Sequence, residues 1–110
     1  MDLSKRVNMC MLMDFYGNML TQKQQNIMHK YYEQDSSLAE IGHEEGISRQ
    51  AVRDAIVVSE NVLCDIEAKL GFVSKHNELK QSANEIIDIV NSDADKKIVV
   101  EKLNLLLKDL

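Results

Sequence analysis

The residues whose types and spacing could do chemistry lie close together between positions 48 and 53. Ser48 is a preferred helix N-cap residue, so it predicts a helix whose first turns present Arg49, Gln50 and Arg53. Guanidinium groups bind phosphates and guanine edges, and a glutamine amide can pair with adenine in the major groove. A helix that begins with these side chains is typical of a DNA recognition helix.

The surrounding stretch, residues 37 to 56, has the form of a helix, a tight turn and a second helix. A helix-turn-helix needs a small residue where the helices cross, a glycine able to adopt positive φ in the turn, and apolar residues on both sides. The residues that meet these needs are Gly42, Gly46, Ile47, Val52 and Ile56. A helical hairpin that merely packs produces a similar pattern, so both interpretations stay open at this point.

Other reactive residue types form no constellation. The histidines, His29, His43 and His76, are scattered, and no two stand at i, i+4 with an acidic partner, as a metal site would require. Cys10 and Cys64 lack a CxxC spacing and fall in apolar helical patterns, which favours reduced core thiols in a cytoplasmic protein. We therefore expect no enzyme, no cofactor and no metal.

Tyrosines offer a second route to nucleic acid, because aromatic rings stack on exposed bases. Tyr31 shares a helical face with Ile27 and Met28, which favours core packing, whereas Tyr32 is expected to point elsewhere. Tyr32 is therefore the tyrosine to watch as a stacking residue.

Length and composition set limits on the protein class. The chain has 110 residues, 45% of them apolar, which is the size and composition of one domain with its own core. No apolar run approaches the ~18 residues that span a bilayer, so we expect neither a membrane anchor nor a signal peptide. The formal net charge of −5 weakens any interpretation that begins from a globally basic surface.

The chain is predicted to be all-α. Proline is absent, and helix starts are indicated by capping boxes at Thr21 with Gln24 and at Ser37 with Glu40. Gly17 and Gly71 are predicted to end helices. The other predicted helices cover about residues 3–16, 49–70, 75–90 and 94–110.

Apolar periodicity predicts the face that each helix uses. The first helix places Leu3, Val7, Cys10, Met11 and Phe15 on one face, and its methionines are expected to fill the core. The long helix over 49–70 is expected to bury Val52, Ile56, Leu63, Ile66 and Leu70. The last two helices carry Leu79, Ala83, Ile86, Ile87 and Val90, and then Ile98, Val99, Leu103, Leu106, Leu107 and Leu110. The final stripe is wide enough to face a core or a partner chain.

Three segments resemble the YlxM family of small bacterial proteins: MDFYGNMLTQKQ (13 to 24), YYEQDSSLAEI (31 to 41) and GISRQAV (46 to 52). The resemblance extends from the N-terminus to about Phe72. It implies a helix-turn-helix fold similar to sigma-factor region 4, and a DNA-binding or regulatory protein. It also implies a link to the signal recognition particle, because family genes lie beside those for its GTPase and receptor.

The sequence departs from that family at three places. Glu45 stands at a turn-side position that is usually apolar, so its carboxylate is expected to point to water or to weaken the packing of the first helix. Val57 and Val58 replace a basic pair. Residues 36 to 71 hold three basic and seven acidic side chains, a local net charge of −4.

This charge balance bears directly on DNA binding, because ordinary DNA-binding proteins make about 6–10 phosphate contacts. Lys5, Arg6, Lys23 and Lys30 could fold alongside Arg49 and Arg53 and supplement them. A homodimer would double the contacts, and Val57, Val58 and the last helix are the interfaces we expect for it.

The sequence thus predicts a helical module over 1–72 and a C-terminal helical hairpin over 73–110 that packs or dimerises, together forming one structural unit. Two functions remain open. One is a regulatory DNA-binding protein that contacts DNA through Ser48, Arg49, Gln50 and Arg53. The other is a helix-turn-helix reused to contact a protein or ribonucleoprotein, such as a signal recognition particle component, without DNA.

Overall fold

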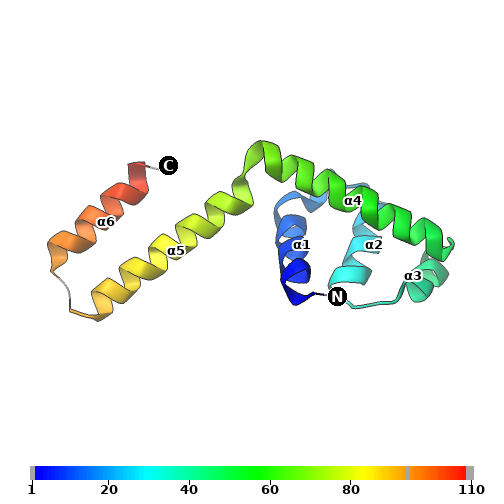
Figure 1. The fold of residues 1–110 in the computed structure, drawn as a ribbon, viewed down its shortest axis with the longest axis horizontal. Helices are drawn as coiled ribbons and strands as arrows, with labels where there is room; N and C mark the ends of the chain where they lie inside the picture. Colours follow the sequence, from blue (N-terminus) through cyan, green and yellow to red (C-terminus); the bar gives the residue numbers. More distant parts are fainter. Residues whose placement is uncertain (1, 94, 109–110) are drawn as a thin grey trace. The chain divides into compact units, whose positions relative to one another are not determined.

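The computed structural model describes residues 2–93 and 95–108. These ranges contain six α-helices, one short 3-10 helix and no strand (Figure 1). The elements are α1 (Leu3–Tyr16), η1 (Gly17–Met19), α2 (Gln22–Tyr32), α3 (Leu38–Glu45), α4 (Arg49–Leu70), α5 (Phe72–Asn91) and α6 (Lys96–Lys108). The chain divides into two compact units, residues 1–73 and residues 74–110. The all-α prediction is confirmed.

Local capping sets the helix starts in the first unit. Both predicted capping boxes are present: Thr21 with Gln24 opens α2, and Ser37 with Glu40 opens α3. The Ser37–Glu40 box lowers the pKa of the Glu40 carboxyl, because the Ser37 backbone N–H and hydroxyl stabilise its charged form. Gly71, with a φ of 66°, ends α4 after Leu70 as predicted.

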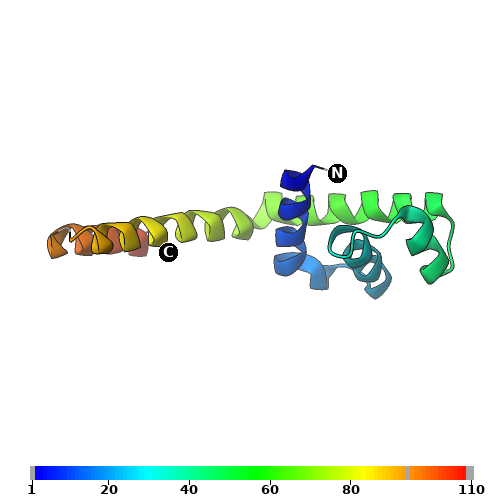
Figure 2. The same ribbon diagram turned by 90° about the horizontal axis from the view of Figure 1, so that it is seen from below.

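The core of the first unit forms where α1, α2 and α3 pack against α4 (Figures 1 and 2). All four helices contribute deeply buried side chains: Met9, Leu12 and Tyr16 from α1, Ile27, Met28 and Tyr32 from α2, Ile41 from α3, and Val52 and Leu63 from α4. This core fixes α4 relative to α3, and so it positions the start of α4.

The predicted core face of α1 is wrong. Met9, Leu12 and Tyr16 are buried, whereas Leu3 and Val7 remain 73% and 58% exposed. The helix has two apolar faces, and α4 contacts the one that the periodicity did not single out.

Three further expectations are corrected. Tyr32 is buried and Tyr31 only partly so, the reverse of the prediction, because the last turn of α2 faces α1 and α4. Leu70 is half-exposed, since α4 reaches beyond the core at its C-terminal end. Cys64 is exposed, so only Cys10 is packed against the core.

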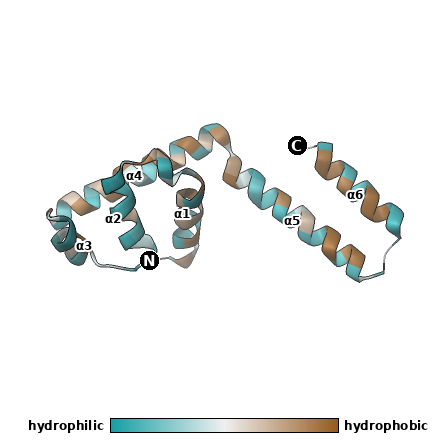
Figure 3. Cartoon of the chain, turned by 180° about the vertical axis from the view of Figure 1, so that it is seen from behind, coloured by the Kyte–Doolittle hydropathy of each residue, from teal (hydrophilic) through white to brown (hydrophobic). Residues whose placement is uncertain are grey.

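The second unit begins at Ser74, so it contains α5 from that residue onward and the whole of α6. Apolar residues recur along both helices (Figure 3). No described residue of α6 is buried, and Ile87, Val90, Ile98 and Leu103 keep about half of their surface exposed. The predicted bounds Ala94 and Leu110 lie outside the described residues. No helix in the described part of the chain is long and apolar enough to cross a membrane.

Candidate nucleic-acid interface

The turn between α3 and α4 is shaped by two glycines with different roles. Gly46 adopts a left-handed conformation, with φ 71° and ψ 32°, which L side chains rarely adopt. Gly42 lies where a Cβ atom would stand 2.6 Å from the Ile47 carbonyl oxygen. The Gly42 carbonyl accepts hydrogen bonds from the backbone N–H groups of Gly46 and Ile47. The close approach of α3 to the turn therefore depends on the missing side chain at Gly42.

The turn leads directly into α4. The Ser48 hydroxyl accepts a 3.0 Å hydrogen bond from the Ala51 N–H, which makes Ser48 the N-cap as predicted. Val52 and Ile56 face inward and are buried, and Ile47 packs against the core. The predicted structural residues of the motif thus lie together in the structure.

The side chains predicted to contact DNA follow the Ser48 cap in the first turns of α4. Arg49, Gln50 and Arg53 are all exposed on the first two turns of α4. The Gln50 amide donates a 2.9 Å hydrogen bond to the Asp54 carboxylate, one turn further along. The structure therefore presents two guanidinium groups and an amide–carboxylate pair on one helix start.

Asp54 was not predicted as a member of this region, and Lys30 was predicted only as a possible DNA contact, not as a partner of α3. Asp54 stands four residues after Gln50, a spacing that places two side chains next to each other on a helix, so this pair was detectable. Lys30 lies in α2 and is brought to α3 only by the fold.

Lys30 resolves the expectation for Glu45. The Lys30 Nζ atom lies 2.7 Å from the Glu44 Oε2 and 3.0 Å from the Glu45 Oε1. Glu44 first and then Glu45 raise the pKa of Lys30, because each carboxylate stabilises the ammonium form. Glu45 neither points freely to water nor weakens α3. It joins α3 to α2 through an ion pair.

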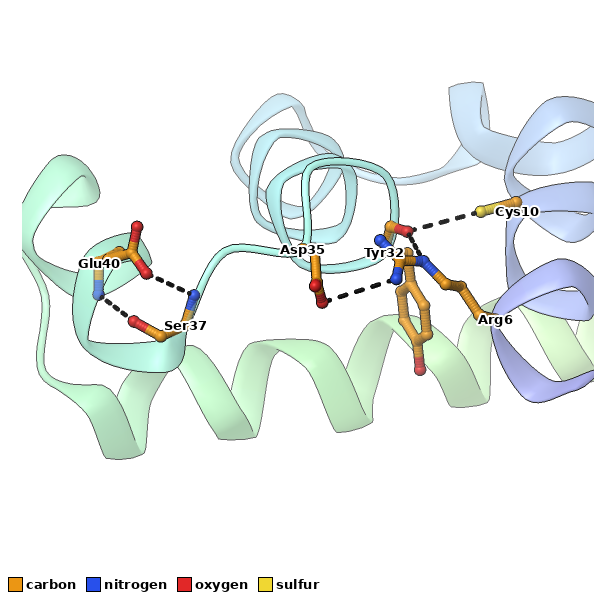
Figure 4. Close-up of polar contacts among 6 residues, drawn as sticks. All are labelled: Arg6, Cys10, Tyr32, Asp35, Ser37 and Glu40. Atoms are coloured by element: carbon orange, nitrogen blue, oxygen red, sulfur yellow. Dashed lines mark hydrogen bonds and ion pairs between the residues drawn. The ribbon is translucent and has the colours of Figure 1, made fainter. Parts of the chain in front are cut away.

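Most of the basic side chains expected to supplement Arg49 and Arg53 are paired elsewhere. Lys30 is held by Glu44 and Glu45, and Lys5 lies 3.8 Å from Glu60. Arg6 lies 3.6 Å from Asp35, and its Nε donates a 2.7 Å bond to the Tyr32 carbonyl (Figure 4). These partners offset the charge of three of the four side chains, whereas Lys23 is exposed, so the supplementary role of the four stays a prediction.

The tyrosines hold α4 in place. The Tyr32 hydroxyl donates to Glu60, and the Tyr16 hydroxyl donates a 2.5 Å hydrogen bond to Glu67. Burial and Glu60 together raise the pKa of Tyr32 well above its ordinary value. Because Tyr16 and Tyr32 are buried in this way, neither ring presents a face for stacking on a base.

Taken together, the Gly42–Gly46 turn, the Ser48 cap and the exposed start of α4 define a helix-turn-helix protein. The family model described as "Putative helix-turn-helix protein, YlxM / p13 like" matches residues 3–104, so the chain belongs to this family, UPF0122.

Curated relatives agree over most of the chain. A UPF0122 protein of Halalkalibacterium halodurans is 39% identical over 108 residues, which cover 98% of this chain and 95% of that protein. A UPF0122 protein of Symbiobacterium thermophilum is 45% identical over 76 residues, or 69% of this chain and 71% of that one. A UPF0122 protein of Desulforamulus reducens is 41% identical over 81 residues, or 74% and 69% of the two chains.

Proposed function

We propose that this protein is a regulatory DNA-binding protein that contacts DNA with the start of α4. The observation that carries the proposal is the exposure of Arg49, Gln50 and Arg53 directly after a glycine-shaped turn and a serine cap. Membership of a family described as helix-turn-helix supports it. Arg49 and Arg53 would bind phosphates or guanine edges, and Gln50 would read a base edge beside Asp54. This role requires a cytoplasmic location.

The local charge makes the binding of one copy weak. Asp54 directly follows Arg53, and residues 36–71 carry a net charge of −4. A monomer therefore offers far fewer cationic contacts than the roughly 6–10 of an ordinary DNA-binding protein. Functional binding thus requires two copies of the chain on one DNA site, which doubles the number of arginines.

The test is a fluorescence-anisotropy titration of the full chain against the DNA upstream of its own gene, with scrambled DNA as competitor. The R49E/R53E variant should lose binding. The matched control, K69E/K97E, makes the same change in net charge at exposed positions in the last turn of α4 and in α6. Equal weakening by both variants would show that the loss of binding follows from overall charge. It would contradict the assignment of Arg49 and Arg53 as the DNA contacts.

A second function is favoured by Val57 and Val58, which remain 50% and 51% exposed on α4. Half-exposed valines in a locally acidic helix-turn-helix suit contact with a protein more than contact with phosphate. In this reading the partner is a component of the signal recognition particle, to which the resemblance to YlxM points. Immobilised protein should then capture the purified particle in the absence of DNA, and V57S/V58S should abolish capture. A clean negative with the wild-type chain would eliminate this function.

A further inference from the structure

The outward face of α1 is apolar but contributes to the core of its unit only through Met11. Leu3, Val7, Met11 and Phe15 follow each other at intervals of four residues. Leu3 and Val7 are largely exposed, Phe15 is 39% exposed, and Met11 is partly buried. The core already uses the other face of the same helix, through Met9, Leu12 and Tyr16. Packing within the first unit therefore does not account for this stripe.

A groove lies beside the stripe. Val7, Cys10 and Met11 of α1 face the end of α2 at Tyr32 and Glu33 across a space of about 470 Å³. A second hollow of about 340 Å³ continues along α1 and α2 and is lined by Met13, Leu20 and Met28 among polar residues. Asp14 and Glu33 line both hollows. The two spaces therefore adjoin at Asp14 and Glu33, and both include apolar residues in their linings.

The rim of this groove is acidic. Asp14 and Glu33 lie between the two hollows, and Asp35 lies close by. One facing basic group is Arg6, which is held by Asp35 and the Tyr32 carbonyl (Figure 4). The other is His29, which contacts Glu33. The carboxylate of Asp14 is exposed and has no ion-pair partner among the described residues. A cation approaching the groove therefore meets an excess of negative charge.

We propose that this α1 groove, formed by Val7, Cys10, Met11, Asp14, Tyr32 and Glu33 and extended along α1 by the exposed Leu3, docks a basic amphipathic helix of another protein. A stripe with four-residue spacing is complementary to the apolar face of a helix laid along it. Unbranched methionine side chains adapt to different apolar partners. The carboxylates select lysine or arginine on the flanks of that helix.

This surface is separate from the proposed DNA interface. The α1 helix is tied to the later half of α4 through Lys5 with Glu60 and Tyr16 with Glu67. Arg49 and Arg53 lie at the beginning of α4, beside α3 (Figure 1). The groove and the start of α4 can therefore be tested independently.

The probe is a fluorescent designed peptide of about 18 residues, or five helical turns, with leucines on one face and lysines on the other. We expect it to bind the full chain and to lose at least about tenfold in affinity to the L3S/V7S variant, as happens when central apolar contacts are removed. The L70S/V100S variant, with two apolar-to-serine changes at half-exposed positions outside the groove, should bind like wild type. The D14K variant should bind more weakly at low salt.

Two peptide controls and one mass measurement make the proposal refutable. A peptide of the same composition in scrambled order, and one with glutamates in place of lysines, should not bind. Equal binding of the glutamate peptide, or binding that L3S/V7S leaves unchanged, would overturn the proposal. If light scattering shows that L3S/V7S lowers the mass of the wild-type assembly, a second copy covers the groove and the proposal is also overturned.

Cys10 supplies an independent readout, because it lies in the groove and Cys64 does not. In a C64S variant the bound peptide should slow alkylation of Cys10 by iodoacetamide, followed by mass spectrometry. Unchanged alkylation at a saturating peptide concentration would show that the peptide binds elsewhere.

Discussion

At the scale of single residues, the two glycines of the turn are required for different physical reasons. Gly46 is required for its backbone conformation, because its φ is positive. Space is not the reason, since a Cβ atom there would meet nothing within 4 Å. Gly42 needs its lack of a side chain, because a Cβ atom would press on the backbone carbonyl of Ile47. Backbone cannot move aside as a flexible side-chain end can, so substitution at Gly42 forces α3 away from the turn.

We therefore predict that G42A lowers the free energy of unfolding by about 1–3 kcal/mol, the range for overpacking a tight site. G46A should cost about 1–2 kcal/mol through its left-handed backbone. G17A is the control, because Gly17 has an ordinary helical φ of −54° and open space around it. Urea unfolding measures all three. A G42A variant as stable as wild type would show that α3 and the turn can separate freely.

Lys30 leads to a pH prediction at the same scale. Its folded-state pKa is raised above the ordinary value of 10.5 by Glu44 and Glu45. The ion pair therefore stabilises the fold fully below that unfolded-state pKa, and the stabilisation is lost as the pH rises through the folded-state pKa.

The difference in unfolding free energy between wild type and K30M should accordingly be constant near neutral pH and shrink above about pH 10.5. K23M, a change at an exposed lysine of the same helix, should show a difference that does not vary in this way. Urea unfolding at several pH values provides the measurement. A K30M difference that persists at high pH would show that packing of the alkyl chain, not charge, is what Lys30 contributes.

Residue-scale features were predictable from the sequence where they are local. Thr21 with Gln24, Ser37 with Glu40, and Ser48 all cap helices within three residues of themselves, and each cap was predicted. The contact of Lys30 with Glu45 joins residues 15 positions apart, and no spacing rule finds it. Pairings of this kind depend on how α2 meets α3.

At the scale of elements, periodicity identifies an apolar face but does not say what covers it. The α1 helix carries two such faces, and the sequence favoured Leu3 and Val7 where the core uses Met9 and Leu12. The same limit explains Tyr31 and Tyr32, whose order of burial depends on the neighbouring helices. For α5, the start at Phe72 instead of about Lys75 follows from the tight turn at Gly71, after which a helix resumes at once.

The second unit shows the same limit in its helices. On α5, Leu79, Ala83, Ile86 and Val90 are spaced by four, three and four residues, and on α6 Val99, Leu103 and Leu106 continue the same rhythm. This is the spacing of helices that pack side by side at a shallow angle. Because none of the described residues of α6 is buried, these apolar stripes require another surface to pack against. A second copy of the hairpin would supply a four-helix bundle.

We predict that the chain is a dimer by light scattering at micromolar concentration and that L103E/L106E makes it a monomer. The expected change follows from placing carboxylates in an apolar seam. N104E, on the polar face of the same helix, should leave the dimer intact. A monomeric mass for the wild-type chain would contradict this prediction. It would also remove the doubling of arginines on which the proposed DNA binding depends.

At the scale of the whole molecule, charge is the property that most constrains the proposed DNA binding. The chain carries a formal net charge of −5, and the fold pairs Lys5, Arg6 and Lys30 with carboxylates. Arg49 and Arg53 are therefore the principal cations at the start of α4. Since the other charges repel DNA, binding must be steeply dependent on these two residues and on salt.

The most direct measurement is the salt dependence of DNA binding by the wild-type chain and by R49Q/R53Q. Each phosphate contact contributes about −0.9 to the slope of log K against log salt, so removing two contacts per chain should make the slope shallower by about 2 for each bound copy. We expect a slope reduced in this way, with the slope of K69Q/K97Q unchanged. Equal slopes for wild type and R49Q/R53Q would mean that the start of α4 does not contact DNA.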